Sequence, residues 1–271
     1  MDVSRYDHSR PDVAANALAL NQGSLEPAPA KASFRNRPPC TLRLVLAISL
    51  DGRLAPPDGG AAQLGGSGDR RVLEQALAWS DAALIGAGTL RVHRCTCLVH
   101  DRAFLDQRLA SGRSAQPKAV VVSGQPQPQF PADWPFFQQP LERWLLRPED
   151  PTELDRLELG FDHVQPLCAD WSSTKASLAD HGLERIVLLG GARLTAALLQ
   201  ADVVDELQLT LTPRVLGGPY GWVPLTGIKL PIGLAASNAW ALQEAVPLGG
   251  DELLVRYSRR RSISADTCDS V

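Results

Sequence analysis

Short apolar runs separated by amphipathic stretches fill the central part of the chain, and they predict strands that alternate with helices. Thr41–Ser49 (TLRLVLAIS) is mostly apolar and stops just before the turn pair Asp51-Gly52, as a buried strand does. Further apolar runs of strand length occupy 82–85, Lys118–Val122 and 185–189. Runs with so few polar positions are typical of strands that are covered on both faces.

Helical spacing appears between these runs. Segment 69–79 places Val72, Leu73, Ala76 and Leu77 on one face, which predicts an amphipathic helix. Further helices are predicted at 101–109, 174–181 and Ala192–Gln200, and weaker strands at 143–146 and 161–167. Segment 205–213 alternates like a strand, and 240–245 with 252–258 predicts an antiparallel hairpin across 247–250.

The alternation predicts an α/β fold with helices on both faces of a mixed, mostly parallel sheet, to which the hairpin adds an antiparallel edge. The Pro-containing polar segment 1–38 and the segment 259–271 show no sustained period. We predict one domain over 39–258, flanked by two disordered tails.

Composition narrows the class of protein. The 271 residues are 44% hydrophobic and 21% charged, which is typical of a soluble globular protein. The formal net charge of −3 provides no strong basic field, so bulk nucleic-acid binding is not expected. No apolar run approaches the roughly 18 residues that span a bilayer, and the N-terminus lacks a signal-peptide core. We therefore expect a cytoplasmic protein with no membrane partner. The five cysteines are too few for a disulfide framework.

Two glycine turns are candidate phosphate sites. Gly86-Ala87-Gly88-Thr89 follows a predicted strand, and its amides and the Thr89 hydroxyl could donate to anionic oxygens. It is not the Rossmann fingerprint, because Arg91 stands where the third glycine belongs. Gly190-Gly191 lies between a strand and a helix N-terminus, an arrangement that binds anions. A tight turn and close helix–strand packing are the structural alternatives. Two such turns in one chain favour a dinucleotide.

Other polar residues follow the strands. Ser123 ends the KAVVV strand, where it could bond a ribose or a 2′-phosphate, or cap a turn. Asp51 could position a substrate or donate a proton, or belong to an ordinary Asp-Gly turn. In an extended chain His93, Cys95 and Cys97 share one face, as zinc ligands would. Their spacing is not C-x-x-C and no second ligand pair lies nearby, so we predict no metal.

The order of these pieces is more specific than any one of them. Along the chain run S-L-D-G-R, a Gly-rich loop and helix, S-D-A-A-L-I-G-A-G-T, V-V-V-S, a strand with G-G-A-R-L, V-D-E-L and P-R-V-L-G-G. Over about residues 41–258 this series resembles the reductase domain of the riboflavin-biosynthesis deaminase/reductase, the RibD C-terminal family. The resemblance implies a dihydrofolate-reductase-like α/β/α sandwich that is usually a homodimer. It also implies an oxidoreductase that uses NADPH on the ribosyl group of 5-amino-6-(5-phosphoribosylamino)uracil.

The resemblance also implies where the ligands lie. The residues along the dinucleotide would be Gly86, Gly88 and Thr89, with Ser123 near the 2′-phosphate, and with Gly190, Gly191, Ala192, Arg193, Leu194 and Thr195 at the pyrophosphate. Ala47 would lie near the nicotinamide and Asp51 at the substrate end.

The chain departs from the family pattern on the substrate side. His93 stands where an Asp is usual, Leu189 where a Glu is frequent, and Leu77 where an Arg is frequent. A protonated His93 would suit a substrate phosphate. The departures leave open a reductase of another small carbonyl, imine or pterin-like substrate, and an NADPH-binding protein without turnover. The zinc signature of the deaminase half, H-x-E with P-C-x-x-C, is absent from this chain, so we expect deamination to belong to another protein.

Overall fold

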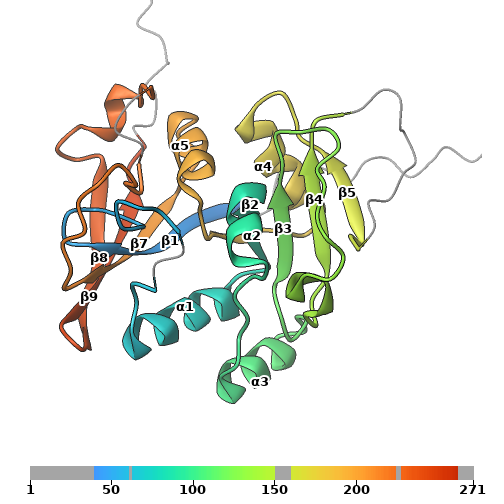
Figure 1. Ribbon diagram of the computed structural model, residues 1–271, viewed down its shortest axis with the longest axis horizontal. Helices are drawn as coiled ribbons and strands as arrows, with labels where there is room; N and C mark the ends of the chain where they lie inside the picture. The colour runs from blue at the N-terminus through green and yellow to red at the C-terminus, as the bar shows by residue number, and fades with distance from the viewer. Residues whose placement is uncertain (1–39, 61–62, 150–159, 224–226, 262–271) are drawn as a thin grey trace, which may run out of the picture. The chain divides into compact units, whose positions relative to one another are not determined.

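A single mixed sheet organises the part of the chain that the computed structural model describes, residues 40–60, 63–149, 160–223 and 227–261. Within these residues the sheet has nine strands in the order β5-β4-β3-β2-β6-β1-β7-β9-β8 (Figure 1). The strands are β1 (Thr41–Ser49), β2 (Ala82–Gly86), β3 (Lys118–Val122), β4 (Arg143–Arg147), β5 (His163–Pro166), β6 (Arg185–Leu188), β7 (Glu206–Thr212), β8 (Trp240–Gly249) and β9 (Glu252–Arg259). Strand pairing is parallel from β5 to β7 and antiparallel in β7–β9 and β8–β9. The predicted mixed, mostly parallel sheet with a C-terminal hairpin is confirmed.

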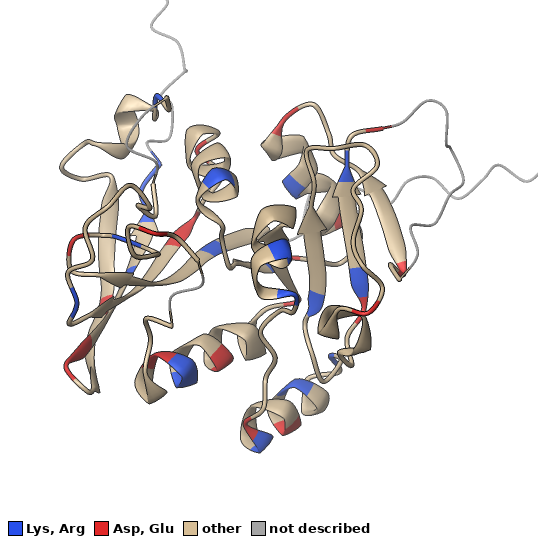
Figure 2. Ribbon diagram, in the orientation of Figure 1, with Lys and Arg blue, Asp and Glu red and all other residues tan. Residues whose placement is uncertain are grey.

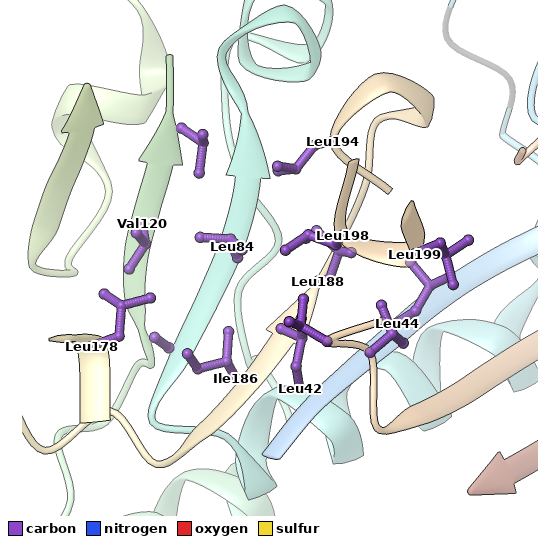
Figure 3. Close-up of a cluster of buried hydrophobic side chains, with 14 of the residues drawn as sticks. Leu42, Leu44, Leu84, Val120, Leu178, Ile186, Leu188, Leu194, Leu198 and Leu199 are labelled. Atoms are coloured by element: carbon purple, nitrogen blue, oxygen red, sulfur yellow. The ribbon is translucent and has the colours of Figure 1, made fainter. Parts of the chain in front are cut away.

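Helices cover both faces of this sheet. They are α1 (Ser67–Trp79), α2 (Ala87–His93), α3 (Arg102–Ala110), α4 (Trp171–Asp180) and α5 (Ala192–Gln200), with short 3-10 helices at Pro135–Gln138 and Ile232–Leu234. In β1, Leu42 and Leu44 face α4 and α5, whereas Val45 packs in the cluster of α1. Figure 3 shows the first face, where strand leucines meet Leu198 of α5. This alternation gives the three layers that were predicted.

An aromatic cluster fills the face on which α2 lies. The segment before β4 contributes Phe130, Phe136 and Phe137, which pack with Phe161 at centroid distances of 5.7–6.1 Å, and Trp134, which packs on Phe130 at 6.0 Å. Phe136 is fully buried. These rings therefore belong to the core.

Several bounds differ from the sequence predictions: α4, predicted at 174–181, begins at Trp171, and α1, predicted at 69–79, begins at Ser67. Helix α2 begins at Ala87, directly inside the glycine turn. The hairpin turns at Gly250-Asp251, not across 247–250, because both residues take the positive φ of a two-residue turn. The predicted tail at 259 is wrong for its first residues, because Arg259 ends β9 and binds Asp202 at 2.9 Å. Residues 1–39 and 262–271, where tails were predicted, lie outside the described residues. Within the described ranges no helix has the length and apolarity needed to cross a membrane.

Side chains from elsewhere hold both ends of α1. At its start, where no side chain of the helix caps it, Glu252 of β9 accepts from the amides of Gly66 (2.6 Å) and Asp69 (3.2 Å). At its end, Arg108 of α3, only 1% exposed, donates to the carbonyls of Leu77, Ala78 and Ser80 at 2.6–3.1 Å. Both contacts satisfy backbone groups that a helix terminus leaves unpaired.

Replacing Arg108 by methionine should destabilise the fold by about 3 kcal/mol, because buried carbonyls lose their donors. Urea unfolding followed by circular dichroism measures the change. The control is Arg102→Met on the same helix, whose side chain is 86% exposed and should change the free energy of unfolding by under about 0.5 kcal/mol. Equal effects of the two variants would show that Arg108 does not hold α1.

Candidate functional site

A gap opens at the carboxyl edge of the sheet because β6 is short. The register of β6 with both neighbours ends at Leu188, opposite Leu44 of β1 and Leu84 of β2. Strand β1 nevertheless continues to Ser49, paired only with β7 on its other side. Within the described residues, 45–49 of β1 therefore have no strand neighbour on the β6 side. Such a point, where neighbouring connections diverge, is where open α/β sheets bind ligands.

Backbone contacts fix one wall of this gap. After β6 the chain leans toward β2, since the Leu189 amide donates to Leu84 (2.9 Å) and the Gly86 amide donates to Gly190 (3.0 Å). Gly190 has a φ of +91°, a conformation that favours glycine. A Cβ atom at Gly191 would lie 2.6 Å from the Thr89 hydroxyl oxygen. The two predicted glycine turns are therefore in contact, and glycine is what allows it.

Two helices begin at this junction without a side-chain cap. The N-cap residues are Gly86 for α2 and Gly191 for α5, and neither helix has an acidic residue in its first turn. At α5 the Thr195 amide bonds to Gly191 (3.0 Å), so the amides of residues 192–194 precede the helical ladder. Figure 2 shows no acidic residue on either helix and a basic residue on each.

Two polar side chains of α5 fit an anion at this end. Arg193 is exposed in the first turn, where a cation opposes the helix dipole unless an anion lies nearby. Thr195 is completely buried, and its hydroxyl oxygen has no hydrogen-bond partner. A buried hydroxyl without a partner is costly, so a ligand that accepts its proton would be stabilised here.

The next strands contribute Ser123 and Arg147 at the same edge. The Ser123 hydroxyl accepts from the Gln125 amide (3.0 Å) and donates to the Gln125 carbonyl (3.1 Å), so it does cap a turn. Arg147 ends β4, is 5% exposed and donates to Pro126 (2.6 Å), while its Nε has no partner. The sequence predictions missed Arg147; a charged residue that closes the apolar run RWLLR was the available signal.

Ala47 lies beside the gap. It is only half-buried, although Leu46 and Ile48 on either side are buried. Its small side chain leaves the opening accessible, so a flat ring such as the predicted nicotinamide has room here.

Asp51 anchors a loop. Its carboxylate accepts from the Ser49 hydroxyl (2.5 Å) and from the amides of Leu216 (3.1 Å) and Gly217 (2.7 Å). The Ser49 bond, followed by these amides, holds the pKa of Asp51 well below its usual range. An ionised carboxylate is a poor proton donor near neutral pH, so these contacts argue against the predicted acid role. Asp51 also borders a cavity of about 470 Å³ with otherwise mostly apolar walls, including Trp222 and Trp240.

The residues that depart from the family pattern are not gathered into a polar cluster. Leu77 is completely buried in the core beneath α1, so position 77 contributes no substrate contact. Leu189 is half-buried against the same core. His93 is exposed at the end of α2, and Cys95 is exposed just after it. Among the described residues no three His, Cys, Asp or Glu side chains could hold one metal ion.

Replacing Asp51 by asparagine should lower the melting temperature at pH 7, because the amide cannot accept from all three donors. A carboxylate whose pKa falls on folding stabilises above its unfolded pKa of about 3.9 and loses that stabilisation as pH falls further. The difference between Asp51→Asn and the natural chain should therefore shrink below about pH 4, measured by calorimetry from pH 2.5 to 7. Asp106→Asn, in an exposed pair with Arg102, is the control. Equal melting temperatures at pH 7 would contradict the anchoring role.

Comparison with known proteins places this geometry in a family. The RibD C-terminal domain model matches residues 40–246. The riboflavin biosynthesis protein RibD of Mycobacterium tuberculosis is 27% identical over 215 residues, 79% of this chain and 53% of that protein. The 2,5-diamino-6-ribosylamino-4(3H)-pyrimidinone 5′-phosphate reductase of Archaeoglobus fulgidus is 24% identical over 186 residues, 64% of this chain and 80% of that protein. The chain thus spans about half the length of the mycobacterial relative.

A solved structure shares the architecture. A pyrimidine reductase-like protein from Corynebacterium diphtheriae superposes with a TM-score of 0.63 at 20% identity, covering 82% of this chain and 93% of that one. Such a likeness confirms the fold class implied by the sequence resemblance. The family model covers most of the described sheet, including both glycine turns and the gap beyond the end of β6. This chain therefore belongs to the RibD C-terminal domain family.

Proposed function

We propose that this chain is an NADPH-dependent reductase of riboflavin biosynthesis that acts on 5-amino-6-(5-phosphoribosylamino)uracil. The observation that carries the proposal is the gap over β6, where α2 and α5 begin side by side without side-chain caps. Family membership and the reductase named among the relatives support it. The whole account of substrate and pathway is a proposal, as are the homodimer and the cytoplasmic location expected from the sequence.

The donor groups at this junction fit a dinucleotide. The free amides of residues 192–194, the Arg193 guanidinium and the unpartnered Thr195 hydroxyl match a pyrophosphate, which carries negative charge and many acceptor oxygens. NADPH, when bound, would supply a hydride. Gly86, Gly88 and Thr89 would line it from α2, opposite the α5 residues Ala192 and Leu194.

The adenosine end would use the carboxyl edge of β3 and β4. Ser123 already gives its one proton to the Gln125 carbonyl, so it would have to exchange that bond to donate to a 2′-phosphate. Arg147 brings a buried positive charge with an unpartnered Nε to the same edge. We include Arg147 with Ser123 as the pair that would favour NADPH over NADH.

A second candidate is a reductase of the same fold with another substrate. It is favoured by the half-buried Leu189, which presents no polar atom at a position where the family pattern frequently has a Glu. Removing a hydrogen-bonding group from a site can change substrate discrimination by orders of magnitude. His93 is then the polar residue among the three departures from the family pattern, and a phosphate contact by His93 stays a prediction.

The direct test combines the purified chain with NADPH or NADH, and with the phosphorylated or dephosphorylated ribosylaminopyrimidine. We expect micromolar NADPH binding by calorimetry, weaker NADH binding, and oxidation followed at 340 nm only with the phosphorylated compound. Oxidation with another carbonyl or imine compound would support the second candidate. Tight NADPH binding without oxidation by any compound would leave the protein as a non-catalytic NADPH binder.

Filling the space at the start of α2 should block the cofactor without harming the fold. A Cβ atom at Gly88 would meet nothing within 4 Å, and replacing a helical glycine gains roughly 1 kcal/mol. Gly88→Leu should therefore keep or raise the melting temperature and weaken NADPH binding at least tenfold. Ala103→Leu, at the second position of α3, is the matched control and should bind normally. Unchanged NADPH binding by Gly88→Leu would contradict the proposed site.

A further inference from the structure

We propose that Asp69 is the acidic residue of the substrate site: it contacts the group being reduced and gives it a proton. This inference rests on the proposed function and adds the catalytic residue that the Asp51 geometry leaves missing. It depends on the position of Asp69 beside the gap and on the groups around its carboxyl.

Asp69 reaches the neighbourhood of Ala47 through β7. It is the third residue of α1, and its amide donates to Glu252 (3.2 Å), whose neighbour Leu253 is the register partner of Leu211 in β7. The start of α1 therefore lies at the carboxyl end of β7, where the Thr210 hydroxyl is close enough to lower the pKa of Asp69. Thr210 is the register partner of Ala47 in the parallel β1–β7 pair, and register partners of parallel strands point to the same face of a sheet. Asp69 and the half-exposed Ala47 therefore lie on the same face of the sheet, the one that α1 covers, toward the end where the hydride would arrive.

The chain around Asp69 is shaped to admit this carboxyl. A Cβ atom at Gly65 would lie 1.9 Å from its Oδ2 atom, so a side chain at position 65 would have to displace it. The next residue, Gly66, gives its amide to Glu252 at 2.6 Å. Gly65 and Gly66 thus allow the Glu252 carboxylate to cap α1 while the Asp69 carboxyl keeps its own position beside Gly65.

The charges near Asp69 favour its protonated form. Burial raises the pKa of Asp69, the Thr210 hydroxyl lowers it, and the carboxylate of Glu252 raises it to a smaller extent. The other titratable groups around it are Arg70, exposed on α1, and the thiol of Cys97 in the loop after α2. Within the described residues neither Asp69 nor Glu252 forms an ion pair. The cap of α1 needs only Glu252, so a second, half-buried carboxyl whose pKa is raised is typical of a functional group.

Reduction of an imine consumes one proton in addition to the hydride, and we assign its delivery to Asp69. In the ring-opened substrate the imine carbon gains the hydride that NADPH supplies, and the C=N π bond breaks. The nitrogen then takes its proton from the Asp69 carboxyl. The reduction as a whole thus forms one new C–H bond and one new N–H bond. Water returns a proton to the Asp69 carboxylate before the next turnover.

The test compares Asp69→Asn with the natural chain, using Asp106→Asn on α3 as a surface control. Turnover by Asp69→Asn should fall by a factor on the order of 10²–10⁴, as expected for loss of a general acid, and calorimetric NADPH affinity should stay within threefold. The kcat/KM of the natural chain should fall at higher pH as Asp69 ionises, and this fall should be absent from Asp69→Asn.

Thermal unfolding provides the readout that does not depend on activity. A carboxyl whose pKa rises on folding stabilises the protein at low pH and loses that contribution as pH rises through the folded pKa. Asp69→Asn should therefore melt at the same or a higher temperature than the natural chain at pH 7 to 8, with the difference shrinking toward pH 4. A purely structural carboxylate predicts a lower melting temperature at pH 7.

Glu252→Gln provides the matched perturbation of the same site. It removes the negative charge next to Asp69, so the pH at which kcat/KM falls should be lower than in the natural chain. At pH values below that fall, turnover should be retained. Turnover of Asp69→Asn within threefold of the natural chain, or a lower melting temperature at pH 7 together with weaker NADPH binding, would overturn the assignment. If the natural chain oxidises NADPH with no pyrimidine or imine compound, the proposed function itself fails, and the acid role fails with it.

Discussion

The early end of β6 is the constraint on which the rest of the site depends. Strand β6 stops at Leu188 and leaves residues 45–49 of β1 without a strand neighbour on that side within the described residues, although β7 pairs with them on the other. The chain then turns through two glycines and starts α5. Because the turn is bonded to β2 and not to β1, the opening lies against β1 and exposes Ala47.

The opposite wall depends on α1, which is held at both ends by charged side chains from other elements. Glu252 reaches its first amides from β9, and Arg108 reaches its last carbonyls from α3. This fixation keeps the first turn of α1, with Asp69, at the carboxyl end of β7. A helix anchored in this way can hold a half-buried carboxyl in place without relaxing away from it, which is the arrangement that a preorganised site needs.

Local sequence patterns predicted the elements whose signals are local. Thr41–Ser49, Lys118–Val122 and Ala192–Gln200 have the predicted bounds, because their apolar positions repeat with the period of the structure they form. Helix α2 was missed because its glycine at position 88 disfavours helix in isolation, whereas packing of Leu90 in the core stabilises it. The hairpin turn was misplaced because Gly249 was as good a turn residue as Gly250.

The candidate site shows the same division. Both glycine turns could be identified from sequence, although only the second requires glycine: Gly190 has a positive φ and Gly191 lies close to Thr89. Their contact through Thr89 and Gly191 is a tertiary fact that no local pattern carries. The tertiary structure alone also places Asp69 near Thr210, Arg147 beside Ser123, and the loop amides on Asp51. Leu77 was interpreted as a lost substrate contact, but its helix turns that position into the core.

The most direct measurement is a crystal structure of this chain with NADP⁺ bound. The account predicts the pyrophosphate at the start of α5, within hydrogen-bond distance of the amides of residues 192–194 and of the Thr195 hydroxyl, and the nicotinamide against Ala47. A cofactor bound elsewhere on the sheet, or a nicotinamide on the far side of α5 from Ala47, would contradict the claim that the short β6 creates the active site.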